Sequence, residues 1–347
     1  MNNEINNEHK KINAPNLRFK EFEGEWETHT LGNIAINISS GKSKSSCGNY
    51  NLYGSTGIIG KTSEAFYDGQ MVLVARVGAN AGKLQLINEK CGITDNTLII
   101  KTEKNYAQYI YYFLQHFNLN RLIFGSGQPL ITGGMLKKVI ISLGDDAEQK
   151  KIAKLLSLLD ERIATQTKVI DRLQSLIKGI AHELFQTARE TKPLSEFVPN
   201  ITSGNDKNEC GTIPLYGSTG IIGMVKHASQ EGNVVLVARV GTIGTVQLIN
   251  HPCGVSDNAL IIKAGNATQY IYHFLKTYNF SRITSGTTQP LITASSLKKI
   301  AIPTFDIERQ NRIVHSLNSL EMKLDIEKQY LSNMTIMKQY LLRQMFI

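Results

Sequence analysis

The segment Gly54-Ser-Thr-Gly-Ile-Ile-Gly-Lys-Thr62 comes closer to a catalytic motif than any other part of the sequence. A phosphate-binding loop has a glycine, four variable residues and then Gly-Lys-Ser/Thr between a strand and a helix. The first glycine would have to stand at position 55, which is a serine, and the similar segment that begins at Gly217 ends in Gly223-Met-Val. We therefore expect glycines that support turns with positive φ, not a nucleotide site.

Other residue types also lack the spacing that catalysis requires. None of the eight prolines is adjacent to another, so the Asn/Asp-Pro-Pro-aromatic stretch expected of a base methyltransferase is absent. The eight histidines do not form i, i+4 pairs with a helical glutamate. Cys47, Cys91, Cys210 and Cys253 lack the Cys-x-x-Cys spacing of a zinc module. The sequence predicts a non-catalytic binding protein with no metal site.

The chain contains two copies of one unit. The string Leu52–Gly60 recurs unchanged at 215–223. When 52–101 is aligned with 215–263 and Ala81 is left unpaired, 31 of 49 aligned pairs are identical. Such a long repeat is not a solenoid unit and predicts two similar domains that pack about a pseudo-two-fold axis. Two independent domains joined by a linker are the alternative.

Each copy has the pattern of an α+β domain. Short β-branched runs bounded by Gly, Asn and Asp predict strands at 71–77, 84–87 and 97–101. The corresponding runs of the second copy are 234–240, 246–249 and 259–263. Apolar residues at helical spacing predict one helix at 108–117 and another at 269–278.

Two further segments have the heptad pattern of long coiled-coil helices. From Glu148 onward, and again from Ile313, apolar residues recur in alternating steps of four and three. Gln166 interrupts the first seam, and Glu327 and Lys338 interrupt the second. The residues predicted to pair the helices are Ile152, Leu156, Leu159, Ile163, Ile170, Leu173, Ile177, Leu317, Leu320, Leu324, Leu331, Met334 and Leu341.

A helix of roughly 40 residues is about 60 Å long and cannot fold back into a small domain, so it needs a partner helix. The simplest partner is the other copy lying antiparallel, with Ile152 near Met345 and Leu184 near Ile313. The two α+β domains would then lie at opposite ends of a rigid rod. Additional apolar residues flank the seam, which indicates either protein partners or packing against the chain's own domains.

Composition and charge restrict the classes of function. The chain of 347 residues is 41% hydrophobic and 19% charged, which is typical of globular proteins. Its net charge of +9 permits a polyanionic partner such as nucleic acid. The lack of a long apolar run and the polar first residues disfavour a membrane span and a secretory signal, so we expect a cytoplasmic protein with no membrane partner.

Four features occur together in an order typical of one known family. They are Leu17-Arg-Phe-Lys-Glu-Phe-Glu-Gly-Glu-Trp26, Leu31-Gly-Asn-Ile34, the duplicated Tyr-Gly-Ser-Thr-Gly-Ile-Ile-Gly and Val-Ala-Arg-Val-Gly strings, and the two long helices. Over essentially its full length, the chain resembles the specificity subunit of a type I restriction-modification enzyme. The resemblance implies two target-recognition domains that each read half of a bipartite site in double-stranded DNA, with paired helices fixing the spacer. These domains are commonly dissimilar in the family, whereas here they are close copies, so we expect a near-palindromic site.

The predicted boundaries follow from these patterns. A first target-recognition domain at 1–146, with a polar N-terminal tail at 1–15, precedes a central helix at 147–187. A second target-recognition domain at 188–305 precedes a C-terminal helix at 306–347. The resemblance implies no catalytic residue and no cofactor in this chain. Two methyltransferase subunits would supply N6-adenine methylation with S-adenosylmethionine, and restriction/translocase subunits would cut DNA with ATP and Mg.

Long polar side chains on glycine-rich loops are candidates for contacts with phosphates and base edges. For the first copy they are Ser55, Thr56, Lys61, Arg76, Asn80, Lys83 and Gln128, and for the second copy Ser218, Thr219, Lys226, Arg239, Thr242 and Gln289. Arg76 and Arg239 stand within predicted strands, where ion pairs with Asp95 and Asp257 are the structural alternative. Gln128 and Gln289 precede prolines, and either could cap a turn.

A second class of function fits the same layout. A pseudo-dimeric, non-catalytic module that binds protein or carbohydrate could also use the long helices as a spacer. A specificity subunit that serves a related restriction type is a further alternative. Neighbouring genes for an adenine methyltransferase and a helicase-nuclease would favour the DNA interpretation.

Overall fold

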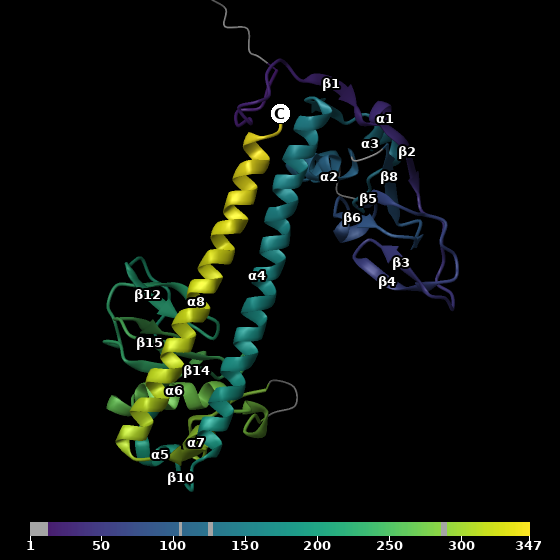
Figure 1. Cartoon of the computed structure of the whole chain (residues 1–347). Helices are drawn as coiled ribbons and strands as arrows, with labels where there is room; N and C mark the ends of the chain where they lie inside the picture. Colours follow the sequence, from purple (N-terminus) through teal and green to yellow (C-terminus); the bar gives the residue numbers. More distant parts are fainter. Residues whose placement is uncertain (1–12, 104–105, 124–127, 286–289) are drawn as a thin grey trace, which may run out of the picture. The chain divides into compact units, whose positions relative to one another are not determined.

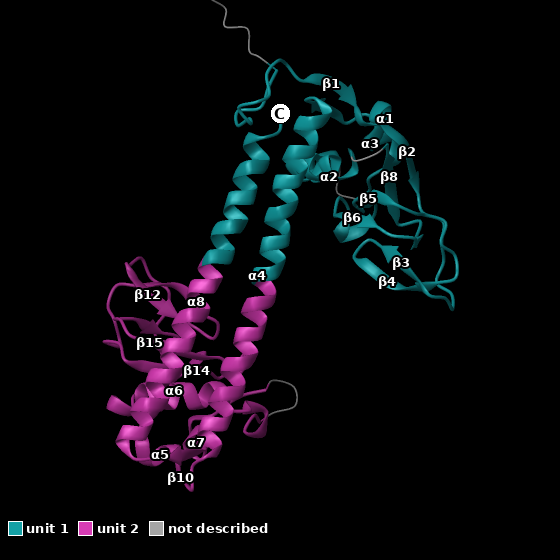
Figure 2. Cartoon of the chain, in the orientation of Figure 1, with its two compact units in different colours: residues 1–166, 330–347 teal, residues 167–329 magenta. Residues whose placement is uncertain are grey.

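The chain forms two compact units. The computed structural model describes residues 13–103, 106–123, 128–285 and 290–347. Unit 1 comprises residues 1–166 and 330–347, and unit 2 comprises residues 167–329 (Figure 2). Each of the two long helices contributes one part to each unit.

Unit 1 is built on a four-stranded antiparallel sheet with the strand order β2-β8-β5-β6 (Figure 1). A three-stranded sheet, β4-β3-β7, and a two-stranded ribbon, β1-β9, also belong to this unit. The bounds are β1 Glu27–Thr30, β2 Ala35–Ser40, β3 Tyr50–Gly54, β4 Gly57–Thr62, β5 Gln70–Ala75, β6 Leu84–Asn88, β7 Gly92–Ile93, β8 Thr97–Thr102 and β9 Ile140–Leu143. The predicted strands at 71–77, 84–87 and 97–101 correspond to β5, β6 and β8, but β5 ends at Ala75 and not at Val77.

Strand β5 lies in the middle of the core because it is apolar on both faces. Val72 and Val74 belong to the same core cluster as the inner face of helix α2 (Tyr106–Phe117). Met71 and Leu73 cluster with residues of β3 and β7 instead. Alternate residues of a strand point to opposite faces, so the main sheet is covered by α2 on one side and by the small sheet on the other.

Unit 2 repeats this architecture with a sheet in the order β11-β17-β14-β15, a small sheet β13-β12-β16 and a ribbon β10-β18. The bounds are β10 Glu190–Pro193, β11 Ile201–Ser203, β12 Ile213–Tyr216, β13 Ile221–Val225, β14 Val234–Ala238, β15 Val246–Ile249, β16 Gly254–Val255, β17 Ala259–Ile262 and β18 Ala301–Thr304. Val235 and Val237 cluster with helix α6 (Thr268–Thr277), and Val234 and Leu236 cluster with the small sheet. The strands and the helix predicted for the second copy are confirmed.

Short helices connect the strands. They are α1 Leu31–Ile34, α3 Gly133–Lys137, α5 Leu194–Phe197, α7 Ala294–Lys298 and the 3₁₀ turns η1 Gly78–Asn80, η2 Leu119–Leu122, η3 Gly265–Ala267 and η4 Phe280–Arg282. Thr132 caps α3 by accepting a hydrogen bond from the Met135 N–H, and Thr293 caps α7 through Ser296 in the same way. The threonine that ends each repeated Gln-Pro-Leu-Ile-Thr string is therefore a helix cap.

The two long helices are α4 (Asp146–Gln186) and α8 (Ile307–Gln344). Each begins after an aspartate whose side chain caps the first turn. Asp145 Oδ1 accepts a hydrogen bond from the Glu148 N–H at 2.7 Å, and Asp306 Oδ1 accepts one from the Arg309 N–H at 2.7 Å. These caps satisfy a backbone donor that the helix itself leaves free.

Within each unit the two helices run antiparallel, as predicted. In unit 1 the beginning of α4 packs with the end of α8, where Ile152 and Met345 share a core cluster. In unit 2 the end of α4 packs with the beginning of α8, where Phe185 and Ile313 share another. All residues of the predicted seams are buried or half-buried, namely Ile152, Leu156, Leu159, Ile163, Ile170, Leu173, Ile177, Leu317, Leu320, Leu324, Leu331, Met334 and Leu341.

An ion pair occupies the polar break at Lys338. Its Nζ lies 2.6 Å from Asp160 Oδ1, and the Tyr112 hydroxyl donates a hydrogen bond to Asp160 Oδ2 at 3.0 Å. This cluster joins α2 to both long helices within unit 1. In unit 2, His273 stands at the position of Tyr112, and its Nε2 lies 2.8 Å from Asn318 Oδ1 of α8.

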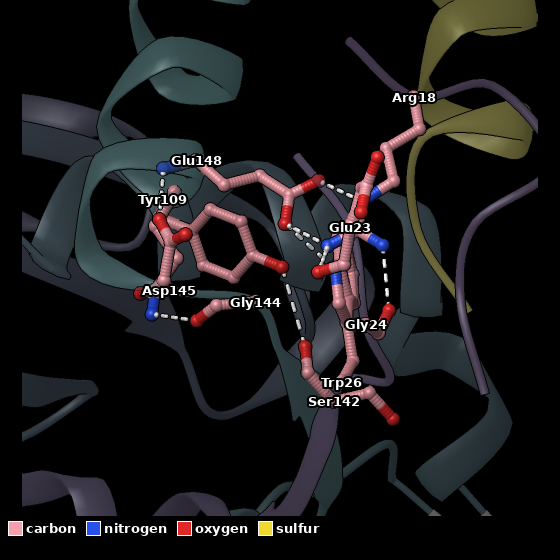
Figure 3. Close-up of polar contacts among 10 residues, drawn as sticks. Arg18, Glu23, Gly24, Trp26, Tyr109, Ser142, Gly144, Asp145 and Glu148 are labelled. Atoms are coloured by element: carbon pink, nitrogen blue, oxygen red, sulfur yellow. Dashed lines mark hydrogen bonds and ion pairs between the residues drawn. The ribbon is translucent and has the colours of Figure 1, made fainter. Parts of the chain in front are cut away.

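The segment before β1 is anchored to the first turn of α4 (Figure 3). Arg18 Nε and Nη2 donate to the two carboxylate oxygens of Glu148 at 2.7 and 2.8 Å, and Trp26 Nε1 donates to the same carboxylate at 2.9 Å. The Glu148 side chain has no exposed area, and its hydrogen bond raises the pKa of Arg18 above its ordinary value. Gly144 cannot carry a side chain because a Cβ atom would overlap the Glu148 carboxylate.

Candidate nucleic-acid interface

The repeated glycine-rich string forms a β-hairpin in each unit, not a phosphate loop. In unit 1, Ser55 and Thr56 lie at the turn between β3 and β4, and the following Gly57 has a φ of 119°. A residue with a Cβ atom would be strained there, so the expectation of a glycine that supports a turn is confirmed. Ser218 and Thr219 lie at the corresponding turn between β12 and β13.

In unit 1 the loop after β5 pairs with the Gln-Pro-Leu-Ile string. Val77 forms an antiparallel bridge with Leu130, and the Ile131 N–H donates to the Arg76 carbonyl oxygen at 2.8 Å. Gln128 is exposed at the beginning of this string. The structure thus brings together two loops that were selected separately from the sequence.

A glutamine side chain connects each hairpin turn to the main sheet. Gln85 Nε2, on β6, donates to the Gly54 carbonyl oxygen at 2.8 Å. Gln247 Nε2, on β15, donates to the Gly217 carbonyl oxygen at 2.9 Å. Because β6 directly follows the loop after β5, the turn and the loop are held as neighbouring parts of one surface in unit 1. Unit 2 has the same arrangement.

Arg76 lies one residue beyond β5, so the prediction that it stands within a strand is wrong, and Arg239 lies likewise beyond β14. Arg76 Nη1 donates to the main-chain oxygen of Asp95 at 3.4 Å. Among the described residues, neither arginine forms the ion pair expected with Asp95 or Asp257. The Nε atoms of both arginines are buried without a hydrogen-bond partner in the protein. A buried donor without an acceptor costs about 1–3 kcal/mol.

Unit 2 places its remaining candidates around the same turn. Thr242 Oγ1 donates to the Ser218 carbonyl oxygen at 3.4 Å. The Ile292 N–H donates to the Arg239 carbonyl oxygen at 3.0 Å, so the second string pairs with Arg239 as the first does with Arg76. Gln289, the counterpart of Gln128, lies outside the described residues.

The remaining predicted polar residues lie in different places. Asn80 and Lys83 are exposed in the loop after β5, next to the paired strings. Lys61 stands on β4, about 13 Å along the strand from the turn, and its Nζ donates to Asn51 Oδ1 at 2.8 Å. Lys226 is exposed just beyond β13. Only Asn80 and Lys83 of these residues therefore share the surface of the loop after β5.

Two exposed lysines, Lys42 and Lys44, lie beside the first hairpin and were not predicted. The Ser46 N–H donates to the Lys61 carbonyl oxygen at 3.2 Å, which holds their segment against β4. The serine-rich and basic composition of 41–46 was the signal that could have identified them. In unit 2 this segment is less basic.

Two of the four cysteines have the burial expected of a structural role. Cys91 and Cys253 are buried in the cores beneath the small sheets, and burial raises the pKa of each thiol to about 11. Cys47 and Cys210 are exposed. Among the described residues, no cluster of three or more His, Cys, Asp or Glu side chains is arranged to hold a metal ion. The same part of the chain contains no helix with the length and apolar character needed to span a membrane.

Both units match one protein family. A family model described as "Type I restriction modification DNA specificity domain" matches residues 23–175 and again residues 184–334. The chain belongs to this specificity family. The two matches fall on the two copies of the repeat. Each includes one hairpin and the loop that contains Arg76 or Arg239.

Individual relatives carry the same family name. The chain is 28% identical over 164 residues to the type I restriction enzyme EcoprrI specificity subunit of Escherichia coli, which covers 44% of this chain and 40% of the relative. It is 32% identical over 148 residues to the type I restriction enzyme MjaVIII specificity subunit of Methanocaldococcus jannaschii, covering 41% and 32%. The aligned parts thus span less than half of these relatives.

Solved structures share the fold. The S subunit of a type I restriction-modification system from Mycoplasma genitalium has a TM-score of 0.71 and 20% identity, covering 96% of this chain and 99% of that chain. A second structure, from work on complex assembly and conformational transition of the type I system, has a TM-score of 0.57 and 14% identity, covering 93% and 97%. The expected α+β architecture with two similar domains and two long antiparallel helices is confirmed for this specificity family member.

Proposed function

We propose that this chain is the DNA-reading subunit of a type I restriction-modification complex. Each unit contacts one half of a bipartite site in double-stranded DNA, and the paired helices fix the spacer. The observation that carries the proposal is that one chain of this family builds the same surface twice. In each unit a polar hairpin turn lies next to the loop that begins with Arg76 or Arg239.

The chemistry of this surface suits a polyanion that is read by hydrogen bonding. Arginine pairs with guanine edges or with phosphates, and serine, threonine, asparagine and glutamine contact bases or phosphates. Ser55, Arg76, Asn80 and Gln128 supply such groups in unit 1. No acidic residue belongs to this set. The proposal therefore assigns recognition to the hairpin turn, the loop after β5 and the Gln-Pro string.

Catalysis is assigned to partners. Two methyltransferase subunits would methylate adenine N6 with S-adenosylmethionine, and restriction/translocase subunits would use ATP and Mg. The family of the chain supports this assignment. The complex would then act on DNA in the cytoplasm. The purified chain should show no methyl transfer to DNA, and activity should appear only when methyltransferase subunits are added. Methyl transfer by the isolated chain would contradict the proposal.

The repeat supports a nearly symmetric site. Two copies of one DNA-reading domain related by a two-fold axis read similar half-sites in inverted orientation, about one helical turn or ~10 base pairs apart. Methylome sequencing of the host should yield a bipartite, adenine-methylated motif whose halves resemble each other after one is reverse-complemented. Halves with no such relation would contradict the symmetric model.

Single substitutions test the proposed surface. Arg76→Ala and Arg239→Ala should each weaken binding of the cognate duplex by about 10- to 100-fold and relax selection in one half-site, because a good arginine–base contact is worth ~1–3 kcal/mol. Lys20→Ala, a charge-matched change at an exposed residue outside the surface, is the control. Equal effects of Lys20→Ala and Arg76→Ala would refute the assignment of the arginine.

A further inference from the structure

Each hairpin exposes two consecutive isoleucines. Ile58 and Ile59 on β4 are 56% and 53% exposed, and Ile221 and Ile222 on β13 are 59% and 49% exposed. Consecutive residues of a regular strand point to opposite faces, so one member of each pair would normally point toward the core. Both members of both pairs instead face solvent.

A β-bulge produces this arrangement in each unit. In unit 1 the partner of Leu52 is Gly60 and the partner of Tyr53 is Ile58, which leaves Ile59 as the extra residue. In unit 2, Ile222 is the extra residue between the pairs formed by Leu215 and Tyr216. A bulge changes the direction of a side chain, and bulges are common next to functional sites.

A glycine makes room for each displayed pair. A Cβ atom on Gly54 would lie 2.9 Å from Ile59 Cδ1, and one on Gly217 would lie 2.9 Å from Ile222 Cδ1. The bulge and the glycine both weaken a strand, yet both copies keep them. The next residues of the same strands differ, with Lys61 in unit 1 and Met224 in unit 2. The exposed apolar pair thus belongs to the string Leu52–Gly60, which both copies preserve, bulge and glycine included.

The surroundings of the pair indicate its occupant. Lys61 stands on the same strand as Ile58, and Lys44 lies in the segment that is hydrogen-bonded to the Lys61 carbonyl oxygen through Ser46. Lys90 Nζ lies 5.6 Å from the ring centroid of Tyr50 on β3. In unit 1 the isoleucine pair therefore lies beside lysines, and such a surface is complementary to DNA, whose bases offer apolar faces and thymine methyl groups between phosphates. In unit 2, Met224 takes the place of Lys61, so the apolar pair is the part of this surface that both units share.

Building on the proposed function, we propose that each isoleucine pair contacts the bases of the bound duplex as an apolar wedge and partly unstacks a base step. In unit 1 the polar turn at Ser55 and the loop that contains Arg76 would supply hydrogen bonds on one side of this wedge, and Lys44 and Lys61 would hold the phosphates. Apolar side chains inserted between base steps bend or open DNA in this way in other proteins.

The test uses the full chain assembled with its methyltransferase subunits. The probe is a duplex that carries the cognate site with 2-aminopurine at successive positions. Ile58→Ser/Ile59→Ser should weaken binding about 30-fold, the loss expected for the contacts of two half-exposed isoleucines. It should also abolish the fluorescence increase that reports unstacking. The slope of affinity against salt should not change, because no phosphate contact is lost.

Matched variants separate the possible outcomes. Ile140→Ser, at a residue that is 62% exposed on the β1-β9 ribbon, should bind like the unaltered complex, and Ile58→Val/Ile59→Val should retain most of the affinity. Unchanged binding by the double serine variant would overturn the wedge while leaving the proposed function intact. Loss of subunit assembly with intact DNA affinity would also overturn it and indicate a protein contact. Failure of the unaltered complex to prefer its cognate site would overturn the proposed function, and the wedge with it.

Discussion

Replacing Arg18 by methionine should destabilise unit 1 strongly. The Glu148 carboxylate has no exposed area and accepts two hydrogen bonds from Arg18 and one from Trp26. Methionine fills a similar volume but supplies neither charge nor donor. The substitution leaves a buried carboxylate with Trp26 Nε1 as its remaining side-chain donor.

The size of the effect follows from the burial of the pair. Removing one partner of a buried ion pair typically costs ~3–5 kcal/mol, because the other charge stays desolvated without compensation. Exposed pairs behave differently. Lys150 and Asp146 pair on the same first turn of α4 with both side chains about half exposed, and Lys150→Met should therefore cost less than ~1 kcal/mol. Lys150→Met is the matched control.

Trp26 provides a direct assay because it is the single tryptophan of the chain and lies in this cluster. Urea unfolding followed by tryptophan fluorescence reports unit 1, and circular dichroism reports both units. Arg18→Met/Glu148→Gln should be more stable than Arg18→Met alone, because it removes the buried charge and leaves an amide oxygen for Trp26. A loss below ~1 kcal/mol for Arg18→Met, or a double variant equal to the sum of the single changes, would refute this reasoning.

Three further predictions concern the cores and the helices. At pH 8, Cys47 and Cys210 should react rapidly with iodoacetamide, whereas Cys91 and Cys253 should react only on unfolding because burial raises their thiol pKa values to about 11; labelling of all four at one rate in the native protein would contradict this. Burial lowers the pKa of His273, which lies beside Glu321 and Lys276. As the pH falls, the histidine of the unfolded chain is therefore protonated at a higher pH than His273 of the folded chain. The contribution of neutral His273 to the free energy of unfolding should thus be complete above pH ~6.5 and decline below it. His273→Gln should make the urea midpoint less dependent on pH between pH 7.5 and 5.5. An unchanged pH dependence would contradict this role of His273. Leu156→Ala, at a fully buried seam position, should cost ~2–5 kcal/mol in thermal or urea unfolding, whereas Leu158→Ala, 48% exposed, should cost far less; similar losses would argue against the seam.

The regular elements could be predicted because their signals are local. The β-branched run of β5 and the heptads of α4 and α8 contain their own periodicity, so both kinds of element were located to within a few residues. Helix α4 begins at Asp146, one residue before the predicted start at 147, because Asp145 caps its first turn. This cap could have been recognised, since an aspartate before the apolar run is a common N-terminal signal.

The anchoring of the N-terminal segment could not be predicted. Glu148 has the sequence context of an exposed acidic residue in a first helical turn, where carboxylates favour the helix dipole. It is instead fully buried by Arg18 and Trp26, which are 130 and 122 residues away. No periodic pattern connects positions so distant. The bulge at Ile59 was equally hidden, because the register of a strand depends on its partner and not on its own sequence.

The same limit explains how much of the candidate interface could be predicted. The sequence predicts Arg76 and Gln128 as polar candidates, but their proximity depends on the bridge between Val77 and Leu130. Lys61 was selected by its place in the glycine-rich string, and the hairpin carries it away from the turn. Composition thus identifies side chains with suitable chemistry, whereas strand pairing decides which of them share a surface.

The two units keep the proposed recognition surface while changing the chemistry of their scaffold. Both have the same hairpin turn, arginine and glutamine connection. However, Tyr112 and Asp160 join α2 to the long helices in unit 1, whereas His273 and Asn318 join α6 to α8 in unit 2. Packing tolerates such exchanges when volume and hydrogen bonds are satisfied. Differences between the two half-sites should then arise from the few loop positions that differ, such as Asn80 and Ile243.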